Sequence, residues 1–164
     1  MKIYLVRHGQ ANSAEIDPEK GLSKSGIIEI KKLAESIRHL RINVKEIWHS
    51  GKVRAYQTAE MLVLTVNSSN GLIEKWGLNP NDDVKPVIDE IKAVNSDIML
   101  VGHLPFMAKL ASVMLMSNEN KCNITFSTGA LGCFSYDKDS FSLDWFIYPG
   151  LITQGDTGSF QSYH

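Results

Sequence analysis

The amino-acid sequence predicts an α/β protein in which helices cover both faces of a central sheet. The main observation is an alternation of short, continuous apolar runs, typical of buried strands, with longer segments whose apolar residues recur at helical spacing. A second observation is bulk composition: 164 residues with a hydrophobic share of 43% suffice for one domain with a sizeable core. We expect one domain over residues 1–154 and a polar, frayed tail over residues 155–164.

The first strand and the first helix have the clearest local signals. The run Lys2 to Val6 contains Ile, Tyr and Val, which favours a buried strand. Polar residues then lead to Gly21, and Ser23 or Ser25 supplies the N-cap of a helix. Apolar residues recur at helical spacing from Ile27 to Leu40, so one face of this helix is expected to pack on the sheet.

The rest of the chain repeats these two patterns. Residues 71–81 contain Gly, Pro and Asn and are expected to be irregular, while Pro105 suits the first turn of a helix. Further strands are expected at residues 44–48 and 98–101, and further helices at residues 53–64, 84–94 and 105–116. Strand-like stretches close the chain at residues 123–126, 130–136 and 141–147.

Composition excludes several classes of protein. A formal net charge of −1 argues against a nucleic-acid binder, which needs a basic surplus. No apolar run approaches the roughly 20 residues that span a bilayer, and the first residues lack the long apolar core of a secretion signal. Cys122 and Cys133 are too few and too far apart for a disulfide framework. We therefore expect a cytoplasmic protein with no nucleic-acid or membrane partner.

Basic and imidazole side chains follow three of the predicted strands. Arg7 and His8 come directly after the first strand, Arg54 follows the second, and His103 follows the strand at residues 98–101. Ligands of α/β sheets collect at the carboxyl ends of the strands. Two of only four arginines lie here, and a guanidinium matches phosphate oxygens in a bidentate way. This pattern predicts a phosphate pocket.

The same residues predict covalent chemistry on phosphorus. His8 is the candidate nucleophile, and Arg7 and Arg54 are expected to keep its imidazole unprotonated and to stabilise charge in the transition state. His103 and the backbone N–H of Leu104, at the start of a helix, could donate hydrogen bonds to a phosphoryl group. Asn12 is a further candidate phosphate ligand. No carboxylate cluster with metal-ligand spacing accompanies them, so we expect neither metal nor cofactor.

These residues lie in segments that resemble the histidine phosphatase superfamily, and within it the small SixA-type phosphohistidine phosphatases. The segments are Arg7-His8-Gly9 with Ala11, Leu22-Ser23-x-x-Gly26, Ser50-Gly51-x-x-Arg54-Ala55-x-Gln57-Thr58-Ala59-Glu60, Val101-Gly102-His103-x-Pro105, and a tail with Trp145, Pro149 and Leu151. The resemblance implies a phosphoglycerate mutase-like fold, a three-layer α/β/α sandwich with a mostly parallel, mixed sheet. It also implies that His8 is phosphorylated and that Arg7, Arg54 and His103 bind phosphate. Gln57, Thr58 and Glu60 are expected to position the second helix.

Two departures from the family pattern stand out. Gly51 replaces the usual proline, which is expected to loosen that loop while leaving Arg54 in place. Larger members supply a glutamate general acid from an insertion that is short here. Glu74, Asp82 and Asp83 are the nearest candidates.

The weak case for a general acid bears on the substrate. A phosphate ester expels a poor leaving group that needs a proton, whereas the imidazole of a phosphohistidine can carry its own ring proton. We therefore favour phosphohistidine on a protein such as a phosphorelay domain. A small-molecule phosphatase or mutase of the same superfamily and a non-catalytic phosphate-binding module remain alternatives.

Overall fold

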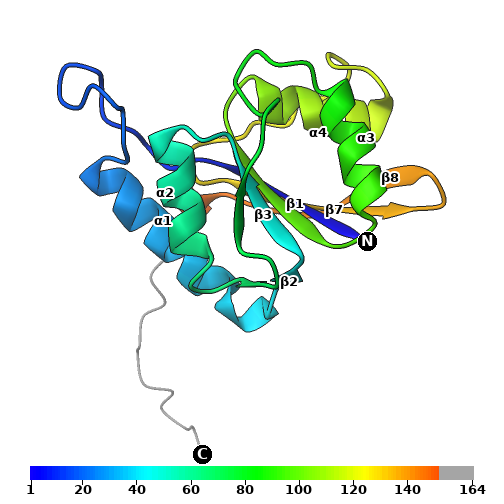
Figure 1. Ribbon diagram of the computed structural model, residues 1–164, viewed down its shortest axis with the longest axis horizontal. Coiled ribbons are helices and arrows are strands. Elements are labelled where there is room, and N and C mark those ends of the chain that lie inside the picture. Colours follow the sequence, from blue (N-terminus) through cyan, green and yellow to red (C-terminus); the bar gives the residue numbers. More distant parts are fainter. Residues whose placement is uncertain (152–164) are drawn as a thin grey trace, which may run out of the picture.

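The computed structural model describes residues 1–151 and has one mixed six-stranded sheet in the order β5-β3-β6-β1-β7-β8 (Figure 1). Its strands are β1 (Lys2–Arg7), β3 (Glu46–His49), β5 (Leu72–Glu74), β6 (Ile98–Gly102), β7 (Leu131–Asp137) and β8 (Ser140–Ile147). The four strands β5, β3, β6 and β1 are parallel, while β7 pairs antiparallel with both β1 and β8. A separate short pair joins β2 (Asn43–Val44) to β4 (Asn67–Ser68).

Helices cover both faces of this sheet. They are α1 (Lys24–Ile37), α2 (Val53–Leu62), α3 (Lys85–Val94) and α4 (Phe106–Met116), with short 3₁₀ segments at Arg38–Leu40 and Pro149–Leu151. Alternate residues of β1 point to opposite faces: Ile3 and Leu5 pack in a core with α3 and α4, whereas Tyr4 and Val6 pack with α1 and α2. Figure 1 shows the two helix pairs on either side of the strands. The predicted three-layer α/β/α class is confirmed.

Local sequence signals located several element boundaries. The Ser23 side chain accepts a hydrogen bond from the Gly26 N–H and caps α1, as one of the two predicted N-caps.

Within residues 1–151, no helix has the length and apolar character needed to cross a membrane. The predicted tail at residues 155–164 lies outside the described residues.

Two expectations about strands were wrong. Residues 71–81 were expected to be irregular, yet β5 forms an edge strand there, between Gly71 and Gly77, both of which have positive φ. The turn signals of these glycines obscure a strand of three residues. Residues 123–126 form no strand. Instead the Phe126 carbonyl accepts a hydrogen bond from Arg7, and the Phe126 ring packs against Phe146.

The start of α1 lies directly against the loop that follows β1. A Cβ at Gly26 would collide with the backbone of Gln10, so only glycine allows this approach. We expect Gly26→Ala to lower the free energy of unfolding by about 1–3 kcal/mol, because the backbone must shift. Urea denaturation measures this, with Lys31→Ala on the exposed face of α1 as the control. Equal stability of the two variants would contradict the close packing.

Candidate active site

The register of three neighbouring strands brings the predicted site residues to one edge of the sheet. Arg7 of β1 pairs with Gly102 of β6, and His49 of β3 pairs with Val101. The strands therefore end almost level, and the residues that follow them become neighbours. His8 follows β1, His103 follows β6, and Arg54 lies in the first turn of α2, just after β3.

His8 is held with one ring nitrogen directed at a guanidinium. Its Nδ1 lies 2.7 Å from the carbonyl oxygen of Gly9, which can only accept, so Nδ1 carries the ring proton. The Nε–H of Arg54 donates to His8 Nε2 at 3.3 Å, so Nε2 presents a lone pair. The tautomer is thus defined from both sides of the ring, and Nε2 is the free nucleophilic atom.

Burial keeps the His8 imidazole neutral. The side chain is 9% exposed, and burial lowers its pKa to about 4. The hydrogen bond to Gly9 opposes this shift, while the charges of Arg54 and then Arg7 lower the pKa further. The sequence prediction assigned the effect to the two arginines alone. The structure shows that desolvation is the larger cause.

His103 lies beside His8 and is also neutral. The two ring centroids are 4.9 Å apart, and His103 is 1% exposed. Burial, followed by the neighbouring His8 and Arg54, lowers its pKa to about 3. Its Nε2 lies 2.6 Å from the hydroxyl of Ser50, while its buried Nδ1 has no partner among residues 1–151. The following Leu104 N–H likewise has no acceptor in the described chain.

Arg7 is the second cation near the two imidazoles, and, in addition to burial, its charge lowers the pKa of both His8 and His103. One guanidinium nitrogen donates to the carbonyl oxygen of Phe126 at 2.7 Å, while the buried Nε has no partner among the described residues. Burial lowers the pKa of both arginines, although a guanidinium stays charged at neutral pH. Two partly desolvated cations beside two neutral imidazoles form an anion site with a nucleophile in it.

The other candidates are less closely tied to the pocket. The Asn12 amide donates to the Leu22 carbonyl. The Asp82 and Asp83 carboxylates accept backbone N–H groups of Asn79 and Lys85 around the start of α3. Within residues 1–151, none of these three side chains hydrogen-bonds His8, Arg7, Arg54 or His103.

Glu74 is the candidate acid that lies against the loop preceding α2. A Cβ at Gly51 would come within 2.5 Å of its carboxylate oxygen. Gly51 has a φ of +80°, which a proline ring cannot adopt. The expected loosening of this loop stays a prediction. Gly51 N–H donates to His49 Nδ1 at 3.2 Å and Lys52 N–H to Ser50 Oγ at 3.4 Å.

Sequence reasoning missed three contributors to the site. Thr58, expected only to position α2, also accepts a hydrogen bond from Gly9 N–H. Ser50 contacts His103, and the Phe126 carbonyl holds Arg7. Ser50 and Thr58 lie in the segment around Arg54, so attention to hydroxyls near a key arginine could have found them. Nothing local marks the carbonyl of Phe126, since its role depends on how a distant loop folds.

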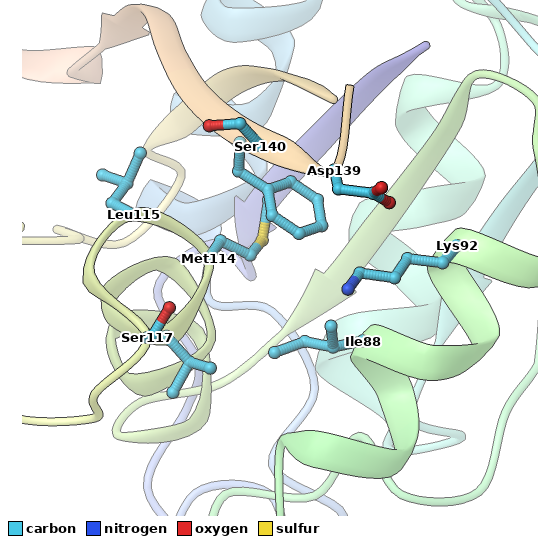
Figure 2. Close-up of a pocket in the computed structure, with 9 residues that line it drawn as sticks. Ile88, Lys92, Met114, Leu115, Ser117, Asp139 and Ser140 are labelled. Atoms are coloured by element: carbon cyan, nitrogen blue, oxygen red, sulfur yellow. The ribbon is translucent and has the colours of Figure 1, made fainter. Parts of the chain in front are cut away.

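A hollow of about 260 Å³ lies at the opposite edge of the sheet, between the ends of α3 and α4 and the β7–β8 turn (Figure 2). This turn is beside the beginning of β1, because Tyr136 N–H donates to the Met1 carbonyl. Met114 and Ile88 form an apolar floor, and Lys92 and Asp139 lie at the rim. One lysine beside a carboxylate is a poor phosphate site, so the hollow does not compete with the His8 pocket.

The two buried imidazoles predict a specific pH dependence of stability. Between pH 6 and 5 an unfolded histidine binds a proton that folded His103, with its pKa of about 3, does not bind. Stability therefore falls as pH falls. We expect the free energy of unfolding to decrease less steeply in His103→Gln than in the wild type, by about 1 kcal/mol per pH unit. Urea titrations at both pH values test this, and parallel curves would show that folded His103 titrates normally.

The chain resembles known proteins in part of its sequence and in its fold. Residues 3–78 match the model of the histidine phosphatase superfamily (branch 1). No curated protein sequence matches the chain significantly.

Solved structures match over most of the chain. The protein histidine phosphatase SixA complexed with tungstate has a TM-score of 0.84 at 21% identity, covering 93% of this chain and 100% of its own. A structure described as a SixA phosphohistidine phosphatase from Agrobacterium tumefaciens has a TM-score of 0.72 at 22% identity, and the match covers 90% of this chain and 97% of that chain. A phosphoserine phosphatase from Entamoeba histolytica has a TM-score of 0.64 at 16% identity, and the match covers 88% of this chain and 95% of that chain. Residues 3–78 thus resemble the histidine phosphatase superfamily in sequence, and the chain shares the fold of the SixA structure.

Proposed function

We propose that this protein is a phosphohistidine phosphatase that forms a phosphorylated intermediate on His8. The observation that carries the proposal is the tautomer of His8, with Nδ1–H on the Gly9 carbonyl and the Nε2 lone pair beside Arg54. The buried Nε of Arg7 and Nδ1 of His103, which have no partner within residues 1–151, supply further polar groups at the site. Tungstate, bound by the similar SixA structure, is a tetrahedral oxyanion like phosphate.

The reaction divides into two displacements. In the first, His8 Nε2 attacks phosphorus and the bond from phosphorus to the substrate nitrogen breaks. The electron pair stays on the substrate imidazole, which leaves neutral because its other nitrogen keeps a proton. In the second, a water oxygen attacks phosphorus, the bond to Nε2 breaks, and the electron pair returns to His8. The water protons leave with inorganic phosphate or pass to solvent.

The pocket residues stabilise both displacements electrostatically. The Arg54 and Arg7 guanidiniums can bind the equatorial oxygens, where negative charge accumulates. The Gly9 carbonyl accepts from Nδ1 and so favours the positive charge that the ring gains when Nε2 bonds to phosphorus. Low solvent exposure of His8 and His103 strengthens these interactions. Within residues 1–151, no three His, Cys, Asp or Glu side chains gather into a metal-binding group, and metal independence stays a prediction.

The choice of phosphohistidine rests on the leaving group. Among the described residues, no carboxylate hydrogen-bonds His8 or His103, and Glu74 lies beside Gly51 with an exposed side chain. A substrate whose leaving group carries its own proton suits this arrangement. The second candidate is a small-molecule phosphomonoesterase. The similar phosphoserine phosphatase favours it, and Glu74 would then be the candidate acid. The proposed substrate is a phosphorylated protein, and the predicted cytoplasmic location remains part of this proposal.

Phosphate transfer to His8 is directly measurable. We expect a protein with ³²P-labelled phosphohistidine to transfer acid-labile label to the wild type and to His39→Asn, an exposed histidine in the 3₁₀ turn after α1. His8→Asn should take up no label and lose at least about 10³-fold in turnover, because the nucleophile is gone. Labelling of His8→Asn, or wild-type turnover without label on His8, would refute the covalent route.

A substrate panel separates the two candidate reactions. We expect kcat/KM for a phosphohistidine protein to exceed that for phosphoserine and sugar phosphates by about 10²-fold or more, because esters need a proton donor. Glu74→Gln should keep kcat/KM for the phosphohistidine protein within about twofold of the wild-type value, since this leaving group needs no acid. Faster hydrolysis of esters, with loss of that activity in Glu74→Gln, would favour the phosphomonoesterase.

A further inference from the structure

Thr58 connects the two residues whose geometry the proposed reaction needs most. It lies on α2, four residues after Arg54, and its side chain is completely buried. Its hydroxyl oxygen accepts a hydrogen bond from Gly9 N–H at 3.1 Å and donates one to the Arg54 carbonyl at 2.7 Å. The directions are unambiguous, because an N–H can only donate and a carbonyl can only accept.

Each of these hydrogen bonds supports one side of the His8 ring. Gly9 is the residue whose carbonyl accepts from His8 Nδ1, so holding its N–H fixes the backbone that selects the tautomer. Arg54 directs its Nε–H at His8 Nε2. The hydrogen bond to the Arg54 carbonyl therefore fixes the backbone from which this side chain extends. A hydroxyl is required for both, since a methyl in the same place neither accepts nor donates.

We propose that Thr58 is a positioning residue that aligns the His8 nucleophile with the Arg54 guanidinium through one shared hydroxyl. This role rests on the proposed function only for its effect on turnover. Its structural consequence, the Nδ1–H tautomer of His8, exists in the free protein. Thr58 touches neither substrate nor reacting atoms, so it acts through Gly9 and Arg54.

The test combines an isosteric variant, a rescue and a matched control. Thr58→Val keeps the shape and removes both hydrogen bonds, and Thr58→Ser keeps the hydroxyl. Thr65→Val is the same substitution just beyond α2, at a partly buried threonine. Thr58→Ala is the second variant if Thr58→Val does not accumulate as folded protein.

The first readout is the ¹⁵N spectrum of the His8 ring at pH 7, which distinguishes Nδ1–H from Nε2–H without substrate. Because the His8 pKa is about 4, its ring is neutral there. We expect the Nδ1–H pattern in the wild type, Thr58→Ser and Thr65→Val, and a mixture of tautomers in Thr58→Val. An Nε2–H wild type, or an unchanged His8 signal in folded Thr58→Val and Thr58→Ala, would overturn the proposal.

The second readout is kinetic, with a phosphohistidine protein as substrate. Misalignment of the nucleophile should lower kcat of Thr58→Val by about 10- to 100-fold, with KM within about twofold, because binding by Arg7 and His103 persists. Thr58→Ser should restore most of kcat. Equal losses in Thr58→Ser and Thr58→Val would assign the effect to the methyl group and overturn the role of the hydroxyl. An inactive wild type with the expected tautomer would refute the proposed function and leave the alignment intact.

Discussion

The contact between the buried His8 imidazole and the partly exposed Arg54 guanidinium is the interaction on which the rest of this site depends. Burial of the imidazole, and after it the Arg54 charge 3.3 Å from Nε2, lower the pKa of His8 and so favour the neutral ring. The guanidinium retains its charge, because arginine does not lose its proton in proteins. The result is an uncharged nucleophile next to a positive charge, an arrangement that favours the approach of an anion.

The fold supplies this arrangement through register and packing. The strands β1, β3 and β6 end at nearly the same level, so the residues that follow them lie side by side. One core packs α2, which carries Arg54, on one face of the sheet, and the other core packs α4, which follows His103, on the opposite face. The loop before β7 completes the pocket, since Gly129 N–H donates to the carbonyls of Arg7 and His8. The strands and the hydrogen-bonded loops thus place His8 beside both Arg54 and His103.

The family match covers part of this pocket, whereas the fold match extends over most of the chain. Residues 3–78 include His8, Arg54, Thr58 and Glu74, whereas His103 lies beyond them and is covered by the similarity in fold. The N-terminal part thus carries His8, the proposed nucleophile, and the Arg54 guanidinium beside it. The second imidazole arrives from β6, next to β1 in the sheet although far from it in the sequence.

The sequence by itself predicted the α/β class, Ser23 as one of two candidate N-caps, and the four candidate site residues Arg7, His8, Arg54 and His103. These features depend on local periodicity, on a side chain that bonds its own helix, and on residue types at strand ends. Tertiary structure alone revealed β5, the Phe126 carbonyl on Arg7, and the position of Glu74 beside Gly51. It also showed that burial dominates the pKa of His8 and that Thr58 joins Gly9 to Arg54. Each of these depends on contacts between segments far apart in the chain, which no local pattern encodes.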